Sequence, residues 1–200
     1  MDFDIKSNGL YSAIPYIFYF LAINAAVNIA DIVRKREILK TTTVRKFMMI
    51  VSLCGQGVFL VATGYCGCGQ DTLAVALITL AQGFSGFQYG GFVVNHVDIA
   101  PRYAGTLFGI TNTVATVSGI VAPSVASALT GDGSREEWRS VFWVAAAVLW
   151  FGAVFYCIFG SGELQTWAGP PPEQSAIDLL NKNELEDISD APEDSIRNTY

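Results

Sequence analysis

The sequence predicts an all-α integral membrane fold, and three observations carry that prediction. Hydrophobic residues make up 52% of the 200-residue chain, and its mean hydropathy is +0.39. Nearly uncharged runs recur at the length of about 20 residues that a membrane helix needs. The polar stretches between these runs are short, and Lys and Arg gather in some of them and avoid others. A soluble all-α protein of this size would not carry so many apolar runs of spanning length.

Five segments are expected to cross the bilayer. They are residues 13–32, 47–64, 72–94, 103–129 and 141–160. The second segment is slightly short, but the aliphatic stems of Arg45 and Lys46 extend it by reaching toward the interface. Residues 1–160 are therefore expected to form one helical membrane unit.

The negative charge of the chain lies in its C-terminal tail. Residues 1–160 hold ten Lys/Arg against nine Asp/Glu, whereas residues 161–200 hold two against nine. With three prolines at 170–172 and little apolar surface after them, 161–200 is predicted to be an acidic, largely disordered tail. With no basic excess over the chain as a whole, we expect no nucleic-acid binding.

The Lys and Arg distribution predicts the orientation of the spans. The loop after the first span holds six basic residues and should be cytoplasmic, whereas residues 65–71 hold none and should face the other side. Arg102 marks a second cytoplasmic loop, and the tail also ends in the cytoplasm. Arg135 and Arg139 depart mildly from this pattern. Five spans with the N-terminus outside suggest a fragment of a larger protein.

No enzyme, cofactor or metal site is expected from the sequence. Cys66 and Cys68 lack the second Cys/His pair that a zinc site needs, and a disulfide between them stays open. Cys54 and Cys157 lie inside apolar runs, where a small buried side chain is the simpler interpretation. There is no glycine-rich phosphate loop, no pair of catalytic carboxylates and no nucleophile beside a base.

A stripe of small and polar residues runs along one face of the fourth expected span. Steps of three and four place its members on one helix face: Gly105, Gly109, Asn112, Thr116, Gly119, Pro123 and Ala126. Small residues let another backbone approach closely, and Pro123 permits a bend. Helix packing is the better interpretation of the glycines. The amide of Asn112, with Thr116 one turn further on, instead favours a functional role because a mid-membrane amide needs a partner or a solute.

The third expected span repeats this pattern with Gly83, Gly86 and Gly90, which we also assign to helix packing. Gln88 and Tyr89 add polar groups on neighbouring faces. The two spans together predict helices that pack tightly around a polar cavity.

The end of the first span carries a charged pair with two open interpretations. Asp31 lies three residues before Arg34, at the start of the basic loop. Its carboxylate either pairs with a neighbouring helix and closes the inner side, or neutralises its own loop.

Residues 95–105 form a short polar segment between two apolar runs and contain the only histidine of the sequence. Pro101 can begin the next helix, and Asp98 can cap that helix or pair with Arg102. His96 alone cannot hold a metal. We expect Asn95 and His96 to be hydrogen-bonding groups at the membrane rim. Proton sensing by His96 is the alternative, since histidine changes charge between pH 5 and 8.

This stretch resembles the anion:cation symporter family of the major facilitator superfamily, which includes sialin, the sodium-dependent phosphate cotransporters and the vesicular glutamate transporters. The resemblance rests on GFVVNHVDIAPRYAG at 91–105, GITNT at 109–113, REEW at 135–138 and GELQTWA at 162–168. Asp31 with its basic cluster resembles the superfamily's loop between helices eight and nine. The match covers about residues 7–168, and within the family FLVA at 59–62 looks most similar to sialin-like members.

The resemblance implies a fold, a mechanism and a set of positions. The five spans would be helices eight to twelve of a twelve-helix transporter, whose substrate site lies between two halves. It implies transport of an anionic solute with H⁺ or Na⁺ across a lysosomal, vesicular or plasma membrane, by alternating access and without a cofactor. Asn112 would line the substrate path, with Thr116, Gln88 and Tyr89 as further candidates. A cytoplasmic gate would contain Asp31, Arg34, Asn95, His96, Asp98 and Arg102. The alternative is a truncated, non-transporting membrane protein that acts as a regulatory or interaction subunit.

Overall fold

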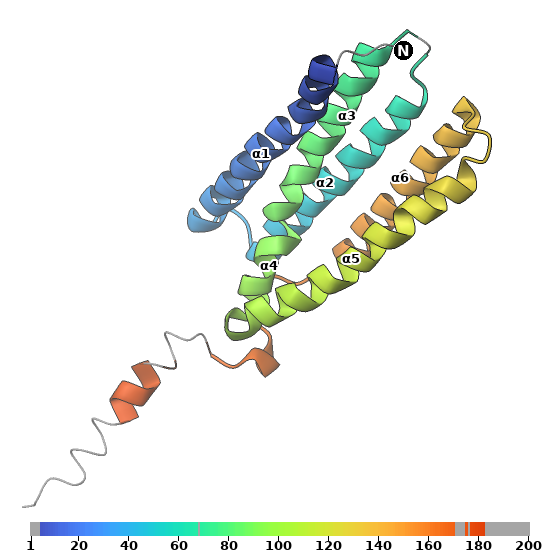
Figure 1. The fold of residues 1–200 in the computed structure, drawn as a ribbon. Helices are drawn as coiled ribbons and strands as arrows, with labels where there is room; N and C mark the ends of the chain where they lie inside the picture. The colour runs from blue at the N-terminus through green and yellow to red at the C-terminus, as the bar shows by residue number, and fades with distance from the viewer. Residues whose placement is uncertain (1–4, 68, 171–174, 176, 183–200) are drawn as a thin grey trace, which may run out of the picture.

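The computed structural model describes residues 5–67, 69–170, 175 and 177–182, and in these residues it contains helices and no strands (Figure 1). The long helices are α1 (Ile5–Lys35), α2 (Thr41–Gly64), α3 (Asp71–Ser85), α5 (Ala104–Leu129) and α6 (Arg135–Phe159). Shorter elements are η1 (Gly86–Tyr89), α4 (Phe92–Ile99), η2 (Pro101–Tyr103) and η3 (Thr166–Ala168). The expected all-α membrane fold is confirmed.

Within the residues that the structure describes, four stretches of helix are long and apolar enough to cross a membrane: Ala13–Lys35, Thr41–Gly64, Pro101–Leu129 and Arg135–Phe159. They correspond to four of the five expected spans. The third expected span, residues 72–94, differs because it is not one continuous α-helix. The chain passes there from α3 through the 3₁₀ turn η1 into α4.

Close packing against α1 and α2 accompanies this break. A Cβ atom on Gly86 would lie 2.9 Å from the Cβ of Ala22, and one on Gly90 would lie 3.0 Å from the carbonyl oxygen of Ala26. Both glycines therefore let the backbone touch α1. Glycine is also a poor helix former, so the residues that permit the contact weaken the helix. The interruption in α-helical hydrogen bonding is covered by protein here, as such irregular backbone inside a membrane requires.

The helices α1, α3, α2 and α6 lie side by side in that order (Figure 1). Two glycines of α2 admit aromatic rings from its neighbours. Gly55 faces the ring of Phe84 in α3, and Gly57 faces the indole of Trp150 in α6. The centre of the bundle is therefore built from rings set against bare backbone, with small residues such as Ala26, Ala81 and Ala146 buried around them.

The two arginines that depart from the expected charge pattern lie where α2 ends. The Nη2 of Arg135 donates to the carbonyl of Cys66 at 2.7 Å, and the guanidinium of Arg139 lies 4.7 Å from the ring centroid of Tyr65. A cation next to a helix C-terminus interacts favourably with the helix dipole. Arg135 and Arg139 therefore join α6 to the end of α2, which explains basic residues on a side expected to hold few.

Helix α5 is the least covered element. None of its residues is buried, and a Cβ on Gly105, Gly109 or Gly119 would meet nothing within 4 Å among the described residues. Pro123 lies inside the helix and is exposed as well. The predicted packing role of this stripe thus has no partner in the described part of the chain, and it stays a prediction.

The first part of the expected tail is packed against the helices. Residues 161–168 contact α2, α4 and η2, and residues 175 and 177–182 are helical. The expected disorder of 171–174, 176 and 183–200 lies outside the described residues. Cys68 does too, so the possible disulfide with Cys66 has no structural counterpart to compare.

We predict opposite effects from adding a methyl group at two glycines of these helices. Gly86→Ala should lower the free energy of unfolding by about 1–3 kcal/mol, since the new Cβ meets the backbone of α1. Gly109→Ala should be neutral or stabilising by up to about 1 kcal/mol, because the site is open and alanine is the better helix former. Titration of the chain in mixed micelles with a denaturing detergent, followed by circular dichroism, measures both. Equal destabilisation of the two variants would contradict the packing described for Gly86.

Candidate functional site

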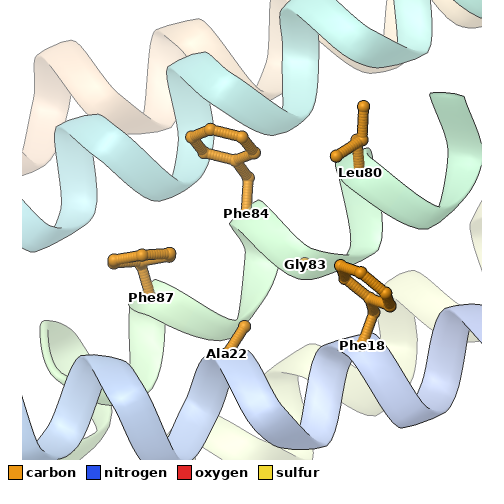
Figure 2. A pocket seen from close by; sticks show the side chains of 6 residues that line it. All are labelled: Phe18, Ala22, Leu80, Gly83, Phe84 and Phe87. Atoms are coloured by element: carbon orange, nitrogen blue, oxygen red, sulfur yellow. The ribbon is translucent and has the colours of Figure 1, made fainter.

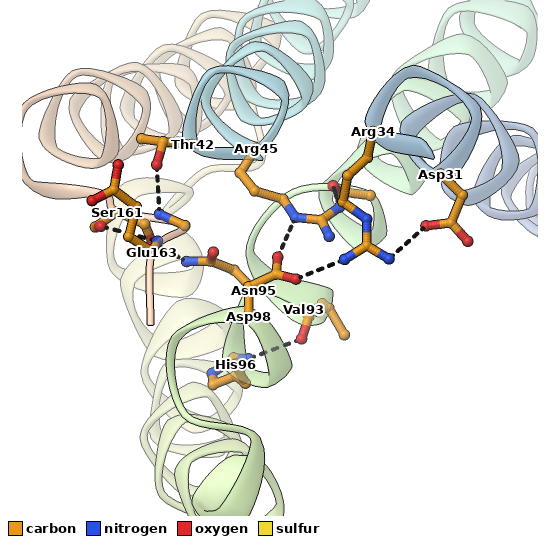
Figure 3. Close-up of polar contacts among 12 residues, drawn as sticks. Asp31, Arg34, Thr42, Arg45, Val93, Asn95, His96, Asp98, Ser161 and Glu163 are labelled. Carbon is orange, nitrogen blue, oxygen red and sulfur yellow. Dashed lines mark hydrogen bonds and ion pairs between the residues drawn. The ribbon is translucent and has the colours of Figure 1, made fainter. Parts of the chain in front are cut away.

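A charged cluster joins three helices at one end of the bundle (Figure 3). The two carboxylate oxygens of Asp98, in α4, divide between two arginines. Oδ2 accepts from the Nε of Arg45 at 2.7 Å, and Oδ1 accepts from the Nη1 of Arg34 at 3.2 Å. The Asp98 side chain is 7% exposed, that of Arg45 2% and that of Arg34 42%. Asp98 and Arg45 therefore form a buried ion pair, to which Arg34 adds a charge from the surface.

Arg45 also donates a hydrogen bond to the backbone where the third expected span is interrupted. It lies one turn inside α2, and its Nη1 donates to the carbonyl of Gly90 at 2.7 Å. Gly90 follows η1 directly, where the α-helical hydrogen-bond pattern is interrupted. The Nη2 of Arg45 has no partner among the described residues. One guanidinium thus holds both the turn before α4 and the carboxylate near the end of α4.

Asp98 takes neither of its two expected roles, because it pairs with Arg34 and Arg45 instead of Arg102, and no side chain of the described residues caps η2 or α5. Ala100, between Asp98 and Arg102, has φ −154° and ψ 77°, so the helix ends before Arg102. Residues 98 and 102 therefore do not share a helix face, as a spacing of four would require. Arg102 is exposed, and a Cβ on Gly169 would lie 3.5 Å from its Nη1. Pro101 begins η2, as the sequence indicates.

The contacts of Asp31 agree with the second interpretation, in which its carboxylate neutralises nearby basic residues of its own segment. Its Oδ1 lies 3.9 Å from the Nη2 of Arg34 in the same helix, and both side chains are about two-fifths exposed. It is therefore Arg34 that reaches the neighbouring helix, and Asp31 neutralises charge next to it (Figure 3).

Asn95 and His96 each link α4 to a different part of the chain. The Nδ2 of Asn95 donates to the carbonyl of Ser161, just after α6, at 2.8 Å. The Nδ1 of His96 donates to the carbonyl of Val93 at 3.0 Å, and its Nε2 lies 3.2 Å from the hydroxyl of Thr111 in α5. Both side chains are buried. His96 is thus a polar link between α4 and α5, with no group of metal-binding residues around it in the described ranges.

The four candidates for the substrate path lie in two separate places. Asn112 and Thr116 are exposed on α5, where the Thr116 hydroxyl donates to the Asn112 carbonyl of its own helix at 2.9 Å. Gln88 and Tyr89 lie in η1, half-buried, with the ring of Tyr89 edge-on to that of Tyr19 at 6.1 Å. No hydrogen bond or ring contact in the described residues joins one pair to the other. Their role stays a prediction.

The hollow between α1 and α3 does not suit an anion. It is lined by Phe18, Ala22, Leu80, Gly83, Phe84 and Phe87, all without polar side chains (Figure 2). Gly83, expected at a helix contact, forms part of this lining, and a Cβ there would lie 3.9 Å from Phe18. A charged solute would lose its hydration in this hollow and gain no partner.

Counting charges along the sequence missed the most buried member of the cluster. Arg45 was assigned to the basic loop and to the interface, like Lys46, although only Arg45 is buried. Its position four residues into a helix, with only Lys46 between it and the apolar run from Phe47, is the available signal. Thr42 and Thr111, which bond to the chain after α6 and to His96, carried no signal of this kind.

We predict that the two arginine partners of Asp98 contribute very differently to the free energy of unfolding. Asp98→Asn should lower the free energy of unfolding by about 3–5 kcal/mol, because it leaves the buried Arg45 charge uncompensated. Arg34→Gln should cost less than about 1 kcal/mol, since that pair is open to solvent. The same micelle titration measures both changes. The assignment of Arg45 as the buried partner is wrong if Arg34→Gln proves the more damaging of the two.

Known proteins similar to this chain carry transporter names. It is 49% identical over 168 residues to the uncharacterized transporter slc-17.2 of Caenorhabditis elegans, 43% over 168 residues to sialin of Homo sapiens, and 42% over 186 residues to vesicular glutamate transporter 2 of Homo sapiens. These matches cover 84%, 84% and 92% of this chain but only 34%, 34% and 32% of the relatives.

No protein-family model matches the chain. The identities to sialin and to the glutamate transporter are almost equal, so the expected likeness to sialin-like members within the family stays a prediction. The chain spans about a third of the length of the relatives it matches. Over that third, the relatives include sialin and vesicular glutamate transporters, and they match the anion:cation symporter family of the major facilitator superfamily that the motifs of this chain resemble.

Proposed function

We propose that this chain is the C-terminal part of a secondary transporter that moves organic or inorganic anions across a membrane. The solute would belong to the sialic acid, acidic amino acid or phosphate class, and a gradient of H⁺ or Na⁺ would drive it by alternating access. The names of the relatives support anion transport in general terms. The observation that carries the proposal is the uncovered polar stripe of α5.

The stripe on α5 has the properties of a surface that faces protein and solute. Its glycines permit close approach of another helix, and no described element occupies that space. The side chain of Asn112 is exposed near the middle of a helix long enough to span the bilayer. An amide there is costly against lipid, so it calls for a protein or aqueous neighbour. Helices beyond this chain would supply that neighbour and complete the substrate path.

The Asp98 cluster supports the second part of the proposal, a gate at the end of the bundle. Asp98, Arg34 and Arg45 connect α4 to α1 and α2 through two ion pairs. An ion pair with one exposed partner can exchange partners more easily than a wholly buried one. Arg34 is therefore the member suited to leave Asp98 when this end of the bundle opens, while Arg45 stays.

The proposal includes a topology and a location. Residues 1–160 would be part of the C-terminal helical half, and the tail from 161 onward would end in the cytoplasm, on the side of the basic loop. The membrane would be lysosomal, vesicular or plasma membrane. The partners would be the lipid bilayer, the anionic solute and the co-transported ion.

A non-transporting regulatory or interaction subunit is the second candidate, because the chain spans only a third of its relatives. The two candidates differ in what the gene encodes before Met1. Seven further apolar spans in the upstream coding sequence would favour the transporter. A natural transcript that begins at Met1 would favour the subunit.

We predict that this chain alone transports nothing, since no described element covers the polar stripe of α5. Proteoliposomes that contain only this chain should show no saturable uptake of labelled sialic acid, glutamate or phosphate under an imposed H⁺ or Na⁺ gradient. Liposomes without protein serve as the baseline. Saturable uptake above that baseline would refute the incomplete substrate path.

A second prediction concerns Asn112 in a longer form that carries the remaining helices. Asn112→Ala should reduce transport at least tenfold, as loss of a buried polar contact to a solute does, with surface expression unchanged. The matched control is Thr113→Ala, on the neighbouring face, whose hydroxyl only bonds the Gly109 carbonyl of its own helix. Normal kinetics in Asn112→Ala, or the same loss in Thr113→Ala, would exclude Asn112 from the substrate path.

A further inference from the structure

The chain turns back after α6 and crosses the ends of two other helices. Three hydrogen bonds hold this crossing. The carbonyl of Ser161 accepts from the Nδ2 of Asn95 at 2.8 Å, and the amide of Gly162 donates to the hydroxyl of Thr42 at 3.0 Å. The amide of Gln165 donates to the carbonyl of Ile99 at 2.9 Å. We call residues 161–168 the strap.

The far end of the strap is anchored as well. The ring of Trp167 lies 6.2 Å from that of Tyr103 in η2, and Ala168 is 1% exposed. Gly169 then has φ +68°, a backbone conformation that suits glycine. The strap is therefore held along its whole length, from α6 to the start of α5.

The strap bonds to the residues that surround the buried ion pair. Thr42 lies one turn before Arg45 in α2, and Asn95 and Ile99 lie three residues before and one residue after Asp98 in α4. Figure 3 shows Thr42, Ser161 and Asn95 next to Arg45 and Asp98. A buried ion pair is favourable only where the geometry is good, because desolvation of both charges has to be offset. A bridge between the two backbones that carry the charges would maintain that geometry.

We propose that the strap positions Asp98 against Arg45, and that its release from α4 accompanies opening of this end of the bundle. The second clause rests on the proposed function. The first does not, since it concerns only how the strap, α4 and α2 are coupled. The strap touches neither charge directly, and it acts through Asn95, Ile99 and Thr42 as positioning residues.

The test uses hydrogen–deuterium exchange and mass spectrometry on this chain in phospholipid nanodiscs, without any solute. Gln165 has φ −81°, close to the value that proline fixes. Gln165→Pro therefore removes the N–H donated to Ile99 with little change of backbone, and Gln165→Ala is the matched control that keeps it. Exchange across residues 94–103 should rise roughly threefold to tenfold in the proline variant relative to the alanine variant. Equal exchange in the two would overturn the proposal.

Repeating Gln165→Pro and Gln165→Ala in an Asp98→Asn background tests whether the strap positions Asp98 or only attaches to α4. If the strap acts through the ion pair, Gln165→Pro speeds exchange across residues 41–49 of α2 only while Asp98 is present, since coupled residues give non-additive effects. The same rise across 41–49 in the Asp98→Asn background would overturn the proposal.

A second pair covers the case in which Gln165→Pro loses its helical circular dichroism. Thr42→Val removes the acceptor for Gly162 at nearly constant volume, and Thr42→Ser retains it. Faster exchange across 94–103 in the valine variant, against wild-type exchange in the serine variant, supports the strap. No difference between the two contradicts it. Because no solute is present in these experiments, failure of the transport proposal would leave their outcome unaffected.

Discussion

The burial of one guanidinium constrains this whole end of the molecule. Arg45 is 1% exposed, and a charge taken out of water is tolerated only with a counter-charge and hydrogen-bond acceptors around it. Asp98 supplies the counter-charge and Gly90 supplies a carbonyl, and both come from the segment that follows η1. The direction of α4, the break before it and the start of α2 are thus tied to the same side chain.

Hydropathy predicts the length of the third span but not its division into α3, η1 and α4. Hydropathy reports how apolar a residue is, and residues 72–94 are mostly apolar and carry no charge. Gly86 and Gly90 were assigned to helix packing from their spacing, and the structure has their backbones against Ala22 and Ala26. Spacing could not reveal that these close contacts coincide with a change from α to 3₁₀ hydrogen bonding. This change leaves the carbonyl of Gly90 free to accept from Arg45.

The pairing of Asp98 depends on backbone geometry that no sequence pattern reports. The non-helical conformation of Ala100 separates Asp98 from Arg102, so a spacing suited to a helical pair was misleading. The fold class, four continuous spans and most members of the polar cluster followed from hydropathy and charge because those signals are local. Arg45 and the strap did not, since their partners lie 53 and 66 residues away in the sequence.

The contrast between α5 and the other helices then follows from the solvent around them. Rings or backbone of neighbouring helices meet Gly55, Gly57 and Gly86, so packing inside the chain accounts for these glycines. On α5, a Cβ on Gly105, Gly109 or Gly119 would meet nothing within 4 Å among the described residues, and the Thr116 hydroxyl bonds its own helix. Lipid could cover the valines and isoleucines of α5 at no cost, but it offers the Asn112 amide no hydrogen bond. A helix with both kinds of surface is stable in a bilayer only when protein or water covers the polar one, and the link from His96 to Thr111 holds α5 with its polar stripe free for that contact.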